Sequence, residues 1–162
     1  MRLHVITTGG TIDKIYFDAK SDYQVGEPVI GELLQRMEVG FPFTVESAMR
    51  KDSLDMDEED RATIRALAER CDEEYVLITH GTDGMVSTAQ ALKGIAGKRI
   101  VLTGALQPAA FAHSDAIFNI GCAIGAVQSA APGVYIAMNG RVFDADRVVK
   151  NVAENRFEET QA

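Results

Sequence analysis

The chain has 162 residues, a formal net charge of −8, 46% hydrophobic residues and 25% charged residues. This length suits a single domain with a substantial core, and the composition excludes a disordered chain and a membrane protein. The acidic balance argues against nucleic acid as a main partner, because binding to the phosphate backbone relies on clustered Lys and Arg.

The cysteines and the N-terminus indicate the compartment. Cys71 and Cys122 are expected on apolar faces of helices, as small buried hydrophobes rather than as a disulfide or a metal site. A strand pattern begins at Leu3 and leaves no room for a signal peptide. No apolar run approaches the roughly 18 residues of a membrane span. We therefore expect a cytoplasmic protein with no membrane partner.

The N-terminal third begins with a buried strand, Leu3–Thr7, which is stopped by glycines. Residues 8–26 have no clean period, and so long a loop in a compact domain is often functional, for example a lid. Pro28 suits the first turn of a helix whose apolar residues continue to Met37. Phe43–Ser47 is the next expected strand.

A polar loop, residues 50–55, leads into an amphipathic helix. Asp55 followed by Glu58 is an N-capping signature. The apolar stripe of this helix consists of Ile64, Leu67, Ala68 and Cys71.

The second half alternates strands and helices. Strands are expected at Tyr75–Thr79, Arg99–Leu102 and Gly133–Met138, with a short extra strand considered at Arg141–Phe143. Helices are expected from Met85 to about Ile95, and from a cap at Ser114 or Asp115 to about Ser129; the polar end, Glu154–Ala162, is expected to be partly frayed. This alternation predicts an α/β fold: one three-layer domain over residues 1–162, with a mostly parallel five-stranded sheet and helices on both faces, flavodoxin-like or Rossmann-like.

Polar side chains follow four of these strands and should meet at one edge of the sheet. They are Thr8 and Thr11, Ser53 and Asp55, Thr82 and Asp83, and Thr103. Hydroxyls and carboxylates without paired His or Cys favour nucleophilic acyl chemistry over metal chemistry. A threonine hydroxyl needs a base, and backbone N–H groups of the glycine turns can stabilise an oxyanion. Lys150 is either that base, oriented by Asp83, or a cation that stabilises negative charge.

Each of these features also has a structural interpretation. Gly9-Gly10 can be a tight turn instead of a phosphate cradle, and Thr82 with Asp83 can cap the following helix. Tyr23 can be a packed aromatic and Lys150 a surface charge. Separately, His4 is expected within the first strand, and His80 is expected to stabilise its turn rather than bind a ligand.

Taken together, several stretches resemble the bacterial-type L-asparaginase family. Thr8-Gly9-Gly10-Thr11-Ile12 is similar to the family's first threonine motif, and Ile78-Thr79-His80-Gly81-Thr82-Asp83 is similar to its second. Further similar segments are Ser21–Gly26, which matches the tyrosine-bearing flexible loop, Thr103–Asn119, and Met138–Lys150.

The resemblance implies a role for individual residues. Thr11 corresponds to the primary nucleophile, activated with help from Tyr23, and Thr82, Asp83 and Lys150 correspond to the second triad. Substrate-binding positions are Gly10, Ser53, Thr82 and Asp83, with Ser53 on the α-carboxylate and Asp83 on the α-amino group. The implied reaction is hydrolysis of L-asparagine to L-aspartate and ammonia through an acyl-enzyme, although direct water attack has also been argued, without a metal or organic cofactor.

Two departures from the family bear on this interpretation. Family members have about twice this length, and their second domain donates an acidic residue to a neighbouring subunit's site. We therefore expect a homo-oligomer, a dimer or tetramer, that closes the site. Leu54 stands where the family usually has a glutamine that binds the substrate amino group, and leucine cannot accept a hydrogen bond. Two alternatives stay open: a non-catalytic module that binds amides or amino acids, and a subunit of an amidotransferase that acts on charged tRNA.

Overall fold

The computed structural model describes residues 1–161, without the side chain of Lys20. Its centre is a six-stranded sheet in the order β4-β1-β5-β6-β7-β8. The parallel strands are β1 (Leu3–Gly9), β4 (Phe43–Lys51), β5 (Tyr75–Thr79), β6 (Arg99–Thr103) and β7 (Gly133–Met138), and β8 (Arg141–Asp144) runs antiparallel to β7. All five predicted strands form, and the sixth, at the edge, is the short extra strand.

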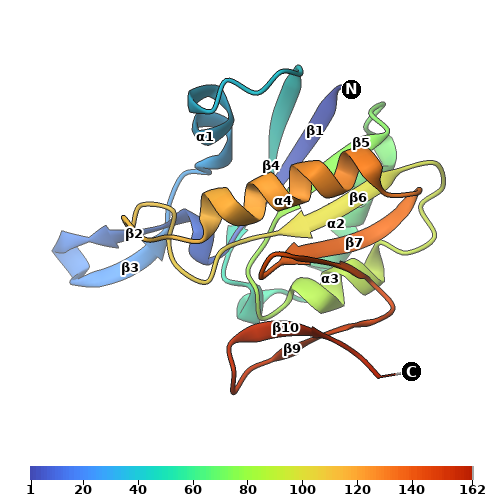
Figure 1. The fold of residues 1–162 in the computed structure, drawn as a ribbon. Helices are drawn as coiled ribbons and strands as arrows, with labels where there is room; N and C mark the ends of the chain where they lie inside the picture. The colour runs from blue at the N-terminus through green and yellow to red at the C-terminus, as the bar shows by residue number, and fades with distance from the viewer. Residues whose placement is uncertain (162) are drawn as a thin grey trace.

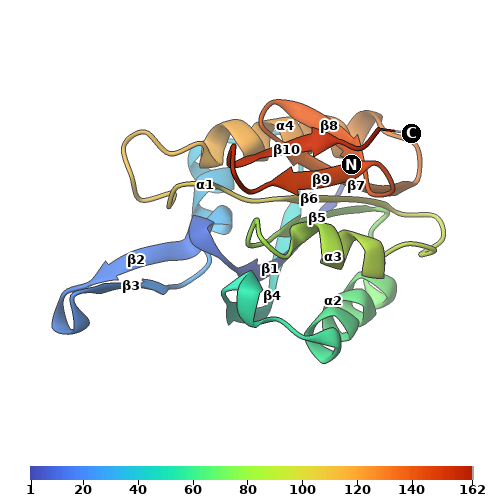
Figure 2. The same ribbon diagram turned by 90° about the horizontal axis from the view of Figure 1, so that it is seen from below.

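Helices cover both faces of this sheet, which confirms the three-layer α/β fold. α1 (Ile30–Arg36) and α4 (Ala116–Ser129) lie on one face, and α2 (Glu58–Arg70) and α3 (Met85–Ala91) lie on the other (Figures 1 and 2). Successive side chains of a strand point to opposite faces. In β5, Leu77 accordingly packs with α1 and α4, whereas Val76 and Ile78 pack with α2 and α3. No helix within residues 1–161 combines the length and hydrophobicity needed to cross a membrane.

The segment expected as a long loop forms a β-hairpin. β2 (Lys14–Phe17) pairs with β3 (Asp22–Val25), and Figure 2 shows the hairpin projecting away from the rest of the domain. Most of its residues are exposed on both faces. The sequence therefore lacks the alternation of polar and apolar residues that identifies a half-buried strand.

The C-terminal segment is ordered into a second two-stranded sheet, so the expected fraying is wrong for residues 156–159. β9 (Val148–Asn151) pairs with β10 (Arg156–Glu159). Phe157 is 2% exposed and Val148 is 5% exposed, and both join the core beneath α2 and α3. These two side chains anchor the β9–β10 hairpin to the domain. Ala162 lies outside the described residues.

The N-cap of α2 is Asp57, not the predicted Asp55. The Asp57 carboxylate accepts a hydrogen bond from the backbone N–H of Asp60, and the Asp60 carboxylate accepts one from the N–H of Asp57. This is a capping box shifted by two residues from the predicted one. Asp55 instead lies in a short 3₁₀ turn, Ser53–Asp55, that follows β4.

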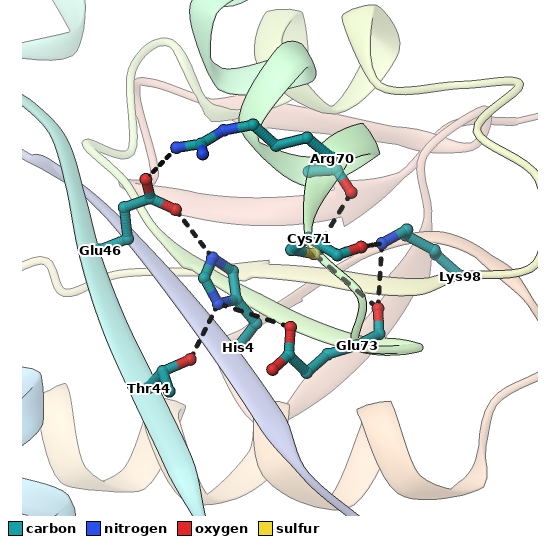
Figure 3. A network of polar contacts seen from close by, with 8 residues as sticks. His4, Thr44, Glu46, Arg70, Cys71, Glu73 and Lys98 are labelled. Atoms are coloured by element: carbon teal, nitrogen blue, oxygen red, sulfur yellow. Dashed lines mark hydrogen bonds and ion pairs between the residues drawn. The ribbon is translucent and has the colours of Figure 1, made fainter.

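A network of polar side chains lies at the amino-terminal end of the parallel strands, opposite the end where the turn Ser53–Asp55 lies (Figure 3). His4 lies within β1 as predicted, with its ring 2.9 Å from Thr44 Oγ1 and 3.1 Å from Glu46 Oε2. Cys71 is the C-cap of α2, is half-buried and packs against the core, and its Sγ lies 3.1 Å from Lys98 Nζ. Cys122 lies in α4, also half-buried, and packs on the core.

Candidate functional site

The candidate site lies where the strand order reverses. The chain runs from β1 to β4 on one side and then returns to β5 on the other side of β1. In open α/β sheets, ligands bind in the crevice outside the carboxyl ends of strands at such a switch point. The turns that follow these three strands carry Thr11, Ser53 and Thr82. The topology thus brings together hydroxyl groups that are 29 or more residues apart in the sequence.

Glycines allow the turn that carries Thr11 (the first threonine turn) to touch the turn that carries Thr82 (the second threonine turn). Gly10 has φ +89° and ψ −175°, a backbone conformation open almost only to glycine. A Cβ atom at Gly10 would lie 2.5 Å from the backbone N of Gly81. A Cβ at Gly9 would lie 2.7 Å from the backbone N of Lys51. Both glycines are therefore needed for close backbone packing, which favours the tight-turn interpretation over a phosphate cradle.

Ser53 packs into the second threonine turn. Its Oγ accepts a hydrogen bond from the backbone N–H of Gly84 at 2.9 Å, and the residue is 5% exposed. A Cβ at Gly81 would lie 2.5 Å from Ser53 Oγ, and one at Gly84 would lie 2.9 Å from Ser53 Cβ. The sequence interpretation missed this contact, since the residues it joins are about 30 positions apart. Leu54, next to Ser53, is 74% exposed.

Lys150, from β9, completes a compact polar group with the second turn. Its Nζ lies 2.9 Å from Thr82 Oγ1 and 2.7 Å from Asp83 Oδ1. Thr82 is 7% exposed, and the side chains of Lys150 and Asp83 are 11% and 39% exposed. This contact is inconsistent with Lys150 as an isolated surface charge. The distance to Thr82 is that of a hydrogen bond, across which a proton can pass between hydroxyl and amine.

No hydrogen bond joins Thr11 to Tyr23 among the described residues. Thr11 is half-buried in a 3₁₀ turn, Thr11–Asp13, and its hydroxyl makes no hydrogen bond within the described part of the chain. Tyr23 is 46% exposed on β3, and its ring packs edge-on against Tyr16 and Phe111, with centroids 5.4 and 5.8 Å apart. In this conformation Tyr23 belongs to an exposed aromatic cluster formed by the hairpin and by Phe111 from the loop before α4.

Two other hydroxyls at this edge of the sheet are occupied by structural bonds. Thr8 Oγ1 donates to the carbonyl of Thr79 at 2.9 Å, and Thr103 Oγ1 donates to the carbonyl of Ala137 at 2.8 Å. Both threonines are fully buried. They hold neighbouring strand ends together, whereas Thr11 and Thr82 lie in the turns beyond the ends of β1 and β5.

His80 stabilises its turn, as predicted. Its Nδ1 donates to the carbonyl of Gly81 at 2.7 Å, and its Nε2 accepts from the hydroxyl of Thr88 in α3 at 2.7 Å. The ring is fully buried, and this burial lowers its pKa from 6.5 to about 4. The neutral ring can be donor and acceptor at once, which fixes the turn that carries Thr82.

We expect His80 to stay neutral throughout the physiological range, with a midpoint near pH 4 in an NMR titration of its ring protons. The unfolded chain binds a proton at this residue near pH 6.5 and the folded chain does not until about pH 4. Stability should therefore fall as the pH is lowered between these values, by up to about 3 kcal/mol. An imidazole that titrates near pH 6.5 in the folded protein would contradict this interpretation.

Comparisons with known proteins find relatives over nearly the whole chain. A family model of the N-terminal domain of asparaginases matches residues 2–159. An L-asparaginase of Thermococcus kodakarensis is 32% identical over 156 residues, which cover 93% of this chain and 48% of the relative. The crystal structure of L-asparaginase I from Vibrio cholerae superposes with a TM-score of 0.85 at 27% identity, over 99% of this chain and 52% of that chain.

A third relative, from Methanococcus vannielii, is one of the subunits of a glutamyl-tRNA(Gln) amidotransferase and is 40% identical over 73 residues. That match covers 44% of this chain and 17% of the relative. The chain spans about half the length of the L-asparaginases it matches. The similarity therefore extends over an N-terminal domain and not over a whole relative.

Proposed function

The chain belongs to the asparaginase family, and from this premise we propose that it hydrolyses L-asparagine to L-aspartate and ammonia. The observation that carries the proposal is the contact of Lys150 Nζ with both Thr82 Oγ1 and Asp83 Oδ1 beside the turn of Thr11. A site that only binds an amide has no need of an amine 2.9 Å from a nearly buried hydroxyl. Nucleophilic acyl chemistry does need one.

In the proposed reaction, Thr11 Oγ1 attacks the side-chain amide carbon of the substrate and loses its proton to a base. The C–N bond breaks, the nitrogen takes up a proton, and ammonia leaves an ester on Thr11. Water activated at Thr82 then cleaves the ester and releases aspartate. Tyr23 assists Thr11 after the hairpin has moved towards the crevice, since its ring packs in the exposed cluster with Tyr16 and Phe111.

Lys150 has two roles open to it in this scheme. As a neutral amine it takes the proton of Thr82, with Asp83 orienting it. As an ammonium it donates to both oxygens and stabilises negative charge. The observed distances serve both roles, and direct attack by water at Thr82 is the corresponding alternative to an ester on Thr11.

Substrate binding is assigned to four residues at the same edge: Gly10, Ser53, Thr82 and Asp83. Ser53 Oγ accepts from Gly84 and keeps its own proton to donate to a substrate carboxylate. Asp83 is exposed enough to meet a substrate ammonium. The exposed Leu54 offers that ammonium no acceptor, and we infer weaker affinity for L-asparagine than a glutamine there would give. A second copy of the chain, in a homo-oligomer, is proposed to cover this open side.

The competing proposal is a non-catalytic module that binds an amide or amino acid at a degenerate site. The exposed Leu54 and the packing of Tyr23 in the exposed aromatic cluster favour it. A role within an amidotransferase rests on the 73-residue match, which covers less than half of this chain. The net charge of −8 argues against contact with tRNA.

Ammonia release from L-asparagine, L-glutamine and D-asparagine separates these proposals. We expect release from L-asparagine, and a fall of about a hundredfold or more in Thr82→Ala and Lys150→Met. Thr63→Ala, at an exposed position on α2, serves as the matched control. Light scattering on the same sample reports the oligomer. Release from no amide would reject the enzyme, and an active monomer would reject the need for a second copy.

A further inference from the structure

The β2–β3 hairpin is joined to the domain mainly at its base. Its strands pair with each other and with no strand of the main sheet. In Figure 2 the hairpin extends as an arm away from the layers of the domain. The direction of this arm therefore depends on the residues where it leaves and re-enters the domain, and the place of Tyr23 depends also on its packing against Phe111.

Asp13 connects three segments at this base. Its backbone N–H donates to the carbonyl of Gly10 at 3.1 Å, and its own carbonyl accepts from the N–H of Gly26 at 2.8 Å. Its side-chain Oδ1 accepts from the backbone N–H of Val29, at the start of α1, at 3.0 Å. One residue thus links the turn of Thr11 to the returning end of the hairpin and to the first helix.

The carboxyl group of Asp13 is buried without a full set of partners. The residue is 2% exposed, and Oδ2 has no hydrogen-bond partner among the described residues. Burial raises its pKa from 3.8 to about 6, against the hydrogen bond from Val29 and the charge of Arg50. A buried carboxylate costs more free energy than a buried neutral acid.

The charged groups around this base are already paired with other residues. Arg50, on β4, is 2.6 Å from Glu27 Oε2, and Lys14, the next residue, is 3.2 Å from Asp52 Oδ2. No ion pair joins Asp13 to a cation within the described part of the chain. Ionisation of Asp13 is therefore less favourable in this arrangement than ionisation of an exposed carboxyl group.

We propose that Asp13 is the positioning residue of the site, whose neutral carboxyl holds the hairpin base closed and whose ionisation loosens the arm that carries Tyr23. Loosening lets water reach the charged Oδ2. The arm then becomes free to move towards or away from Thr11. The link to catalysis rests on the proposed function, whereas the link between Asp13 and the hairpin does not.

Hydrogen exchange of the backbone amides of Gly26 and Val29 tests this proposal, after correction for the intrinsic pH dependence of exchange. In the wild type we expect protection at both amides to fall as the pH rises from 3.8 to about 6, and to level off above that value. The fall is at most about a hundredfold, the factor set by a pKa difference of about two units between closed and open forms. In Asp13→Asn, which keeps an acceptor for Val29, protection should not depend on pH in this range.

Asp18→Asn is the matched control, because it removes a carboxylate from the exposed turn of the hairpin and leaves the base intact. It should behave as the wild type. Protection that does not vary with pH in the wild type would overturn the proposal, even if Asp13→Asn failed to fold. The same pH dependence in Asp13→Asn as in the wild type would also overturn it.

A kinetic measurement connects the hairpin to the site. If Tyr23 acts from this arm, KM and kcat for ammonia release should respond to pH near 6 in the wild type, and this response should be absent in Asp13→Asn. If the protein hydrolyses no amide, the proposed function is wrong, and the role of Asp13 is still decided by the hydrogen-exchange result. A pH response retained in Asp13→Asn would separate the hairpin from catalysis.

Discussion

Replacement of Thr11 by alanine should lower ammonia release from L-asparagine by about three to six orders of magnitude. The proposed ester forms on Thr11 Oγ1, and alanine offers no atom to replace it. The fold should survive, because the half-buried Thr11 side chain makes no hydrogen bond within the described residues. We expect a change of less than about 1 kcal/mol in the free energy of unfolding, measured in urea.

Thr63→Ala is a suitable control for this loss. Thr63 is exposed on α2, and its hydroxyl donates only to the carbonyl of Glu59 at 3.1 Å. Its replacement should leave the rate unchanged. In Thr82→Ala, the ester on Thr11 should be hydrolysed slowly, because the proposed water-activating hydroxyl is missing. Acid quench after mixing with L-asparagine, followed by peptide mapping, should therefore locate the ester on Thr11. An ester on Thr82 in the wild type, with full activity of Thr11→Ala, would reverse the order of the two threonines.

Gly10→Ala should damage both stability and activity. The new Cβ would lie 2.5 Å from the N and 2.6 Å from the Cα of Gly81, atoms that cannot rotate away. The backbone at φ +89° adds strain for any residue other than glycine. We expect a loss of roughly 2–5 kcal/mol in stability, and a lowering of Tm by roughly 5–15 °C. Displacement of the two threonine turns should also lower ammonia release at least about a hundredfold.

Gly40→Ala provides the comparison for this effect. Nothing lies within 4 Å of a Cβ at Gly40, and its φ is not positive. Its Tm should stay within about 2 °C of the wild type or rise slightly, since alanine restricts the unfolded chain more than glycine does. Equal Tm values for Gly10→Ala and the wild type would show that the two turns do not need their close contact.

Local sequence signals predicted the main sheet well. Tyr75–Thr79 and Gly133–Met138 form strands with the predicted bounds, because each is a short apolar run with turn residues at both ends. The hairpin was not predicted, because its two strands are exposed and carry no apolar period. The cap of α2 was misplaced because several acidic residues precede the helix, and only the observed bonds select Asp57.

The site depended on information of two kinds. The position of Thr11 and Thr82 at one sheet edge follows from parallel strands, and the structure brings their turns into contact through Gly10 and Gly81. The place of Lys150 beside these threonines was predictable only from the resemblance to the family. Lys150 and Asp83 are 67 positions apart in the sequence, and no rule of local spacing applies over that distance. The contacts of Gly84 with Ser53, and the place of Tyr23, depend on tertiary packing that no local pattern encodes.

The position of Lys150 on β9 has a consequence for the order in which the site is assembled during synthesis. Every strand of the parallel sheet, and both threonine turns, precede residue 139, whereas β9 follows them and is held by Val148 and Phe157. A nascent chain can therefore complete its parallel strands while Thr82 still lacks its amine. Because β9 pairs with β10, the amine is secured only when β10 has left the ribosome, and the contact of Lys150 with Thr82 and Asp83 is completed with that step.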